Sequence, residues 1–78
     1  MDDDAPKAAL IRAAELAGGQ AALGRKIGKA QSSVWNWLRA GRCPPEMAIP
    51  IEAAVERKVT RQQLRPDIYP AAAEGAPA

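Results

Sequence analysis

QAALGRKIGKAQSSVWNWL, residues 20–38, decides the fold, because two short amphipathic segments flank its central Gly28. Apolar residues recur at helical spacing on both sides of this glycine. Gly28 itself provides the permissive backbone that a sharp turn needs. The stretch therefore predicts a helix-turn-helix, whose core is formed by Leu23, Ile27, Val34, Trp37 and Leu38.

The charges in and around this stretch have one sign. Every charged residue between positions 20 and 45 is basic, whereas all the acidic residues lie outside that range. A segregated basic face is typical of a phosphate-binding surface. The same charges also fit a solvated face of a small domain, and charge alone does not choose between the two.

The composition predicts one small cytoplasmic domain without catalytic residues. With 47% hydrophobic but only 4% aromatic residues, the 78-residue chain predicts a thin helical core. Cys43 is the lone cysteine, no apolar run is long enough to cross a membrane, and the start MDDDAPK is unlike a secretory signal. The chain has no histidine. We expect no catalysis, no metal and no cofactor.

The chain outside the central stretch divides into a flexible acidic N-terminus, residues 1–5, a domain over 6–70, and a disordered tail over 71–78. A first helix is predicted over 6–17, because Pro6 suits a first turn and Gly18 with Gly19 stops the helix. A second helix follows at once, and a third is expected over 31–40, where Gly41 ends it.

Three residues make local predictions. Gly24 weakens its helix by roughly 1 kcal/mol relative to alanine, which favours close passage of another backbone over a merely tolerated loss. Pro50 predicts either a kink in a fourth helix that begins at Pro45 or a helix that restarts at Pro50. Thr60 with Gln63 is typical of a capping box that opens one last short helix.

The third helix carries the side chains best suited to reading DNA. The amides of Gln31 and Asn36 pair well with adenine, and Arg39 reaches either a guanine or the backbone. Residues 35 and 37 point about 200° apart on a helix, so we place Trp37 in the core and Trp35 outward, against DNA or a protein. The predicted base-reading residues are Gln31, Ser32, Trp35, Asn36 and Arg39.

A second set is predicted to hold phosphates. Gln20 opens the second helix, where a side-chain amide and unpaired backbone N–H groups bind an anion well. Ser33 either contacts phosphate or caps its helix, and nearby cations add non-specific attraction. This set comprises Gln20, Lys26, Lys29, Ser33 and Arg42.

With these residues in view, the chain resembles the Cro-like, lambda-repressor-type helix-turn-helix proteins, and among them YdaS-type antitoxins or prophage regulators. The motifs GGQAALGRKIG, QSSVWNWL, GRCPPEMAIPIE and VTRQQLRPD carry the resemblance over about residues 13–70. It implies an all-α, compact bundle of about five short helices, and a bacterial or phage-encoded regulator that binds its operator as a dimer.

Two functions are predicted. The first is a sequence-specific transcriptional regulator that reads a short palindrome in the major groove of double-stranded DNA with helix 31–40. The alternative is a protein-interaction module that neutralises a toxin or binds another regulator, with DNA binding secondary. Contacts with a second copy or another partner are predicted at Val59, Ile68 and Tyr69.

Overall fold

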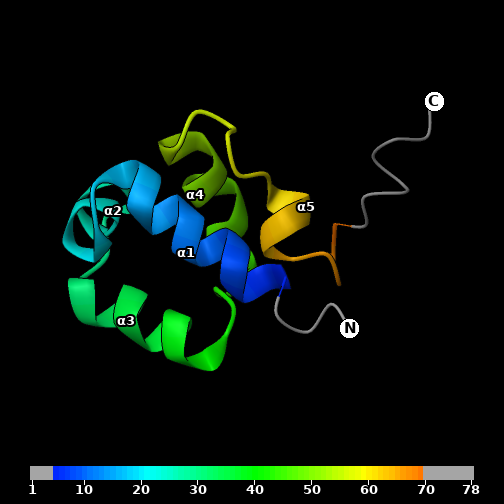
Figure 1. The fold of residues 1–78 in the computed structure, drawn as a ribbon, viewed down its shortest axis with the longest axis horizontal. Coiled ribbons are helices and arrows are strands. Elements are labelled where there is room, and N and C mark those ends of the chain that lie inside the picture. The colour runs from blue at the N-terminus through cyan, green and yellow to red at the C-terminus, as the bar shows by residue number, and fades with distance from the viewer. Residues whose placement is uncertain (1–4, 70–78) are drawn as a thin grey trace.

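A computed structural model describes residues 5–69, and within that range all the regular secondary structure is helical (Figure 1). This confirms the predicted fold class of a compact all-helical domain with five α-helices. No helix among the described residues is long and apolar enough to cross a bilayer. The elements are α1 (Ala5–Ala17), α2 (Gln20–Ile27), α3 (Gln31–Ala40), the 3-10 turn η1 (Pro45–Met47), α4 (Ala48–Ala54) and α5 (Arg61–Leu64).

The first helix starts one residue earlier than predicted, at Ala5, so the predicted flexible N-terminus loses its last residue to α1. The rest of that N-terminus, residues 1–4, and the predicted disordered tail, residues 71–78, lie outside the described residues.

One fully buried aliphatic side chain from each helix meets the others in the core. These residues come from α1 through α5 in turn, and are Leu10, Leu23, Val34, Ile51 and Leu64. The helix α1 packs against α2, α3, α4 and α5, which makes it the common wall of the bundle (Figure 1). Alanines at positions 13 and 14 are buried in this wall. Small side chains there let the helices approach closely.

The helices α2 and α3 are joined by a tight three-residue turn. Gly28 adopts the left-handed conformation at φ 76°, and its N–H donates to the Gly24 carbonyl. The Lys29 N–H donates to the same carbonyl at 2.8 Å. The turn therefore folds back onto the middle of α2 instead of leading away from it.

Gly24 is the position that allows this return. A Cβ added there would lie 2.5 Å from the Lys29 carbonyl oxygen, which is well inside contact distance. The close-packing interpretation of Gly24 is therefore confirmed, and the passing backbone is that of the turn itself.

Pro50 does not kink its helix, because α4 begins at Ala48 and places the proline within the first turn. Backbone N–H groups of a first helical turn have no intrahelical partner, so a proline costs little there. The predicted helix from Pro45 is instead split into η1 and α4, with the break two residues before Pro50.

The predicted capping box of the last helix is confirmed. The Gln63 N–H donates to the Thr60 Oγ1 at 3.2 Å, and the Thr60 N–H donates to the Gln63 Oε1 at 3.0 Å. These two bonds fix the start of α5, which is only four residues long.

Replacement of Gly24 by alanine is expected to destabilise the fold, although alanine is the better helix former by roughly 1 kcal/mol. The added methyl group would force the turn backbone away from α2, with a net loss of about 1–3 kcal/mol in the free energy of unfolding. Urea denaturation followed by circular dichroism measures this change.

Gly28→Ala is the control, because its added Cβ meets no atom within 4 Å and only the left-handed backbone is strained. If Gly24→Ala unfolds at the same urea concentration as the parent protein, close backbone passage is not the reason for glycine at this position.

Candidate nucleic-acid interface

The outward face of α3 brings the five predicted base-reading residues together on one exposed surface. All of Gln31, Ser32, Trp35, Asn36 and Arg39 are exposed. We call this set the α3 face. Its apolar neighbours Val34, Trp37 and Leu38 point the other way and pack in or against the core.

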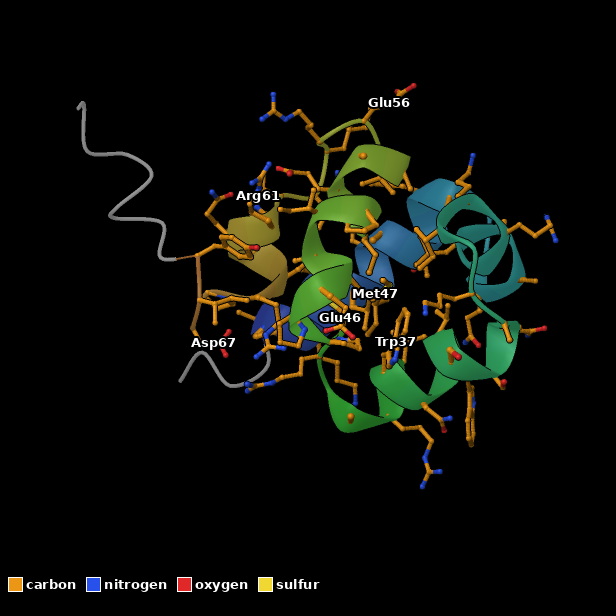
Figure 2. All side chains as sticks on the ribbon, turned by 180° about the vertical axis from the view of Figure 1, so that it is seen from behind. Trp37, Glu46, Met47, Glu56, Arg61 and Asp67 are labelled. Carbon is orange, nitrogen blue, oxygen red and sulfur yellow. The ribbon has the colours of Figure 1, made fainter. Side chains whose placement is uncertain are left out.

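The two tryptophans separate as predicted. The side chain of Trp37 lies on the inner side of α3, towards Met47 of η1 (Figure 2), and both residues pack against the core. Trp35, by contrast, is 48% exposed. Because the indole of Trp35 is not needed for the core, its presence at the surface calls for another explanation.

The predicted phosphate-binding residues surround the α3 face with different degrees of exposure. Lys26, Lys29 and Arg42 are exposed, whereas Gln20 and Ser33 are half-buried at the starts of α2 and α3. Neither helix has an acidic residue in its first turn. The N-caps of α2 and α3 are Gly19 and Ala30, which make no side-chain capping bond.

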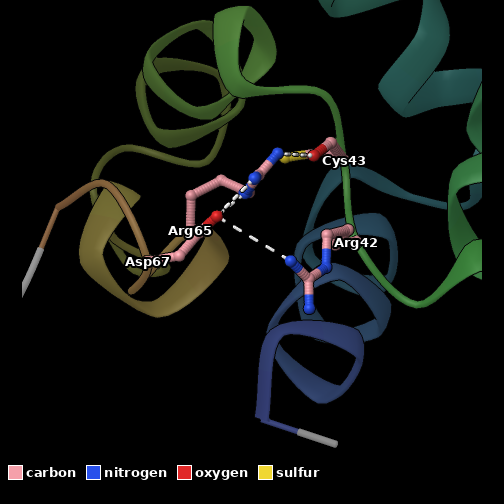
Figure 3. Close-up of polar contacts among 4 residues, drawn as sticks. All are labelled: Arg42, Cys43, Arg65 and Asp67. Carbon is pink, nitrogen blue, oxygen red and sulfur yellow. Dashed lines mark hydrogen bonds and ion pairs between the residues drawn. The ribbon is translucent and has the colours of Figure 1, made fainter. Parts of the chain in front are cut away.

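One predicted phosphate-binding cation is partly engaged by an acid that lies far away in the sequence. The Nη1 of Arg42 lies 3.8 Å from the Oδ2 of Asp67 (Figure 3). This contact was not predicted, because no local sequence pattern places Asp67 beside Arg42. Of the five basic residues between positions 20 and 45, Arg42 is thus the one that pairs with an acid among the described residues.

Asp67 is itself held by Arg65, the most deeply buried of these three charged residues. The Nε of Arg65 donates to the Oδ1 of Asp67 at 3.0 Å, and its Nη2 donates to the Oδ2. Its Nη1 donates to the Cys43 carbonyl at 2.8 Å (Figure 3). Arg65 therefore ties the segment after α5 to the loop after α3, and it does so through three of its donors.

Two residues of this region have strongly shifted pKa values, for different reasons. The bonds from Arg65 lower the pKa of Asp67 from 3.8 to about 2. Burial raises the pKa of the Cys43 thiol to about 11, and only 1% of Cys43 is exposed. The thiol is consequently protonated at neutral pH, as befits a small core residue.

Glu52, a buried acid, organises the opposite end of α5. The Oε1 of Glu52 accepts a hydrogen bond from the Arg61 Nε at 2.9 Å, and the Arg57 Nε lies 3.9 Å from its other oxygen. The guanidinium of Arg61 also lies over the Tyr69 ring, 5.7 Å from its centroid. Sequence reasoning missed this cluster, since no local pattern marks Glu52 as a buried acid.

The predicted partner-contact set requires one correction. Val59 is 0% exposed and belongs to the core, so its side chain has no surface to offer a partner. Tyr69 is half-buried against the core. Ile68 is 44% exposed and is therefore the accessible apolar residue of the set.

Comparison with known proteins gives one match. A family model described as "Bacterial toxin YdaS" matches residues 10–73, which span α1 to α5 and the segment that holds Asp67. No curated protein and no solved structure matches the chain. The description names a toxin, whereas the sequence resemblance suggested an antitoxin or a prophage regulator.

Asp67→Asn is expected to remove a pH-dependent part of the stability. Because folding lowers the pKa of Asp67, this part is fully present above about pH 4 and is lost as the pH falls towards about 2. The side chain is 43% exposed, so screening by water limits the effect to about 1 kcal/mol or less. Thermal unfolding between pH 2 and pH 7 measures it.

The difference in melting temperature between the parent protein and Asp67→Asn should be greatest near neutral pH and should shrink below pH 3. Glu15→Gln is the matched control, because Glu15 is an exposed acid of α1. A difference that stays constant across the pH range would contradict the assigned role of the Asp67 carboxylate.

Proposed function

The chain belongs to the bacterial toxin YdaS family, and on that premise we propose that it is a sequence-specific DNA-binding regulator of transcription. The observation that carries the proposal is the α3 face, five exposed side chains that are amide, hydroxyl, aromatic or basic, and never acidic. These are the groups that hydrogen-bond to base edges or pack on them.

The dimensions of α3 suit the major groove. An α-helix with its side chains is about 10–12 Å across, which fits a groove about 12 Å wide, and the ten residues of α3 extend about 15 Å along it. The helix would enter with its first turn foremost, so that Gln31 and Asn36 present their amides to base edges. Each amide is able to form a bidentate pair with adenine.

Flanking cations would position α3 on the duplex without reading its sequence. Lys26 near the end of α2 and Lys29 in the turn are exposed, and the described residues form no ion pair with either of them. Gln20 at the start of α2 would add a hydrogen bond to phosphate. Arg42 would contribute less than the lysines, because Asp67 already engages it.

A domain with one recognition helix gains affinity by binding two half-sites as a dimer. The half-sites would then be one helical turn apart, about 34 Å between centres. Ile68 is the exposed apolar residue that we assign to the contact between the two copies. DNA selected from a random pool would show this arrangement as two-fold symmetry.

The substitution Gln31→Ala is expected to weaken binding to the selected DNA by about 1–3 kcal/mol and to leave binding to random DNA nearly unchanged. Lys26→Ala should instead weaken binding to both DNAs by the same factor, because a phosphate contact carries no sequence information. Gel mobility shifts with both probes at one fixed salt concentration measure the two effects. Equal losses on the two probes for Gln31→Ala would refute base reading by this residue.

A second candidate function is supported by the family's description as a toxin and by the exposure of Ile68. In this case the chain would act on the cell through a protein contact, with DNA binding secondary. Expression in a bacterial host should then slow growth, and Ile68→Asp should restore it while Gln31→Ala does not. Restoration by Gln31→Ala would instead assign the growth defect to DNA binding, whether or not Ile68→Asp also restores growth, because Ile68 is also assigned to the contact between the two DNA-bound copies.

A further inference from the structure

We propose that Trp35 and Arg39 act as one unit that reads a thymine next to a guanine in the bound DNA. This inference rests on the proposed function and names the bases that one part of the α3 face selects. The guanidinium of Arg39 lies over the Trp35 ring, 4.8 Å from its centroid. The two residues are four apart on α3, where side chains of a helix lie one above the other.

The stacked arrangement leaves the hydrogen-bonding edge of Arg39 available. A guanidinium that stacks on an aromatic ring uses its flat face, while its N–H donors lie in the plane and point outward. Among the described residues, four arginines form ion pairs with a carboxylate, namely Arg42, Arg57, Arg61 and Arg65. Arg39 forms no ion pair with a carboxylate in this range. Its donors are therefore unclaimed by acids within residues 5–69.

Guanine is the base that matches those donors. It presents two acceptors, O6 and N7, on its major-groove edge, and arginine binds both in a bidentate pair. Stacking on Trp35 restricts the arginine before DNA arrives. Less side-chain freedom is then lost on binding.

Thymine is the neighbouring base that matches the indole. Trp35 remains 48% exposed although Arg39 covers part of it. The methyl group of thymine is the apolar group in the major groove. The guanidinium lies 4.8 Å from the ring centroid, which is more than one base step of about 3.4 Å and less than two. We therefore assign the pair to two adjacent base pairs.

The inference differs from a purely structural use of the same contact. An exposed cation-π pair would stabilise α3 slightly whatever the bases in the groove. Such a role predicts that replacing Trp35 or Arg39 by alanine lowers the melting temperature and leaves the selected DNA sequence unchanged. Base reading predicts the loss of preference at two adjacent positions.

The first experiment selects bound DNA from a random pool with the full chain and with the variants Trp35→Ala and Arg39→Ala. The parent protein should enrich a thymine beside a guanine. Trp35→Ala should lose the thymine preference and weaken the guanine preference, whereas Arg39→Ala should lose the guanine preference. Glu15→Gln is the control, because Glu15 is exposed on α1 and lies outside the α3 face, and it should leave both of these positions enriched.

The second experiment changes single atoms of the selected DNA. Uracil in place of the thymine removes only the methyl group, and should weaken binding of the parent protein about fourfold, as expected for one buried methyl group. Replacement of the guanine by 7-deazaguanine removes one acceptor, and should weaken binding by about tenfold. Fluorescence anisotropy at fixed salt measures both, and Trp35→Ala should not respond to uracil.

The outcomes separate this inference from the function on which it rests. If the parent protein enriches no sequence, the proposed DNA-binding function fails and this inference fails with it. If it enriches a sequence but is indifferent to uracil and 7-deazaguanine, the function stands and the reading of this step by Trp35 and Arg39 is refuted. Trp35→Phe, which retains an aromatic face, should keep both preferences in part.

Discussion

The approach of the Lys29 carbonyl to Gly24 is the constraint on which the arrangement of α2 and α3 depends. The backbone returns across the middle of α2, and the space that a Cβ of Gly24 would need is taken by that carbonyl oxygen. This return fixes the angle at which α3 leaves the turn. Once the angle is set, the spacing of Val34, Trp37 and Leu38 directs one side of α3 to the core, and the remaining polar side chains face outward.

The last described helix, α5, is held in place by charges rather than by a large apolar surface. The short helix α5 adds one fully buried leucine, Leu64, and is framed by Glu52 on one side and Arg65 on the other. Both charged residues are buried and both are hydrogen-bonded, which is the condition under which a small core tolerates them. Arg65 joins α5 to the loop after α3, so the position of Arg42 depends on a residue more than twenty places away.

The proposed DNA-binding surface needs no cavity and no catalytic group. It needs only a helix that packs against the core on one side and is exposed on the other. The α3 face meets that requirement. The match to the YdaS family covers residues 10–73, which include nearly all of the helices that support this face. The same surface carries an exposed indole stacked with an arginine. Under the proposal, this pair suits the face to particular bases and not only to a phosphate backbone.

The sequence by itself determined that the chain is helical, that glycines end the first three helices, and which residues lie on the two sides of α3, because these features depend on residues within one or two helical turns. The apolar spacing around Gly28 and the capping box at Thr60 are of this local kind. Only the tertiary structure decided that Val59 is buried, that Asp67 engages Arg42, and that α4 begins at Ala48. Those outcomes depend on which segments distant in the sequence pack together, and a local pattern of residue types does not encode that choice.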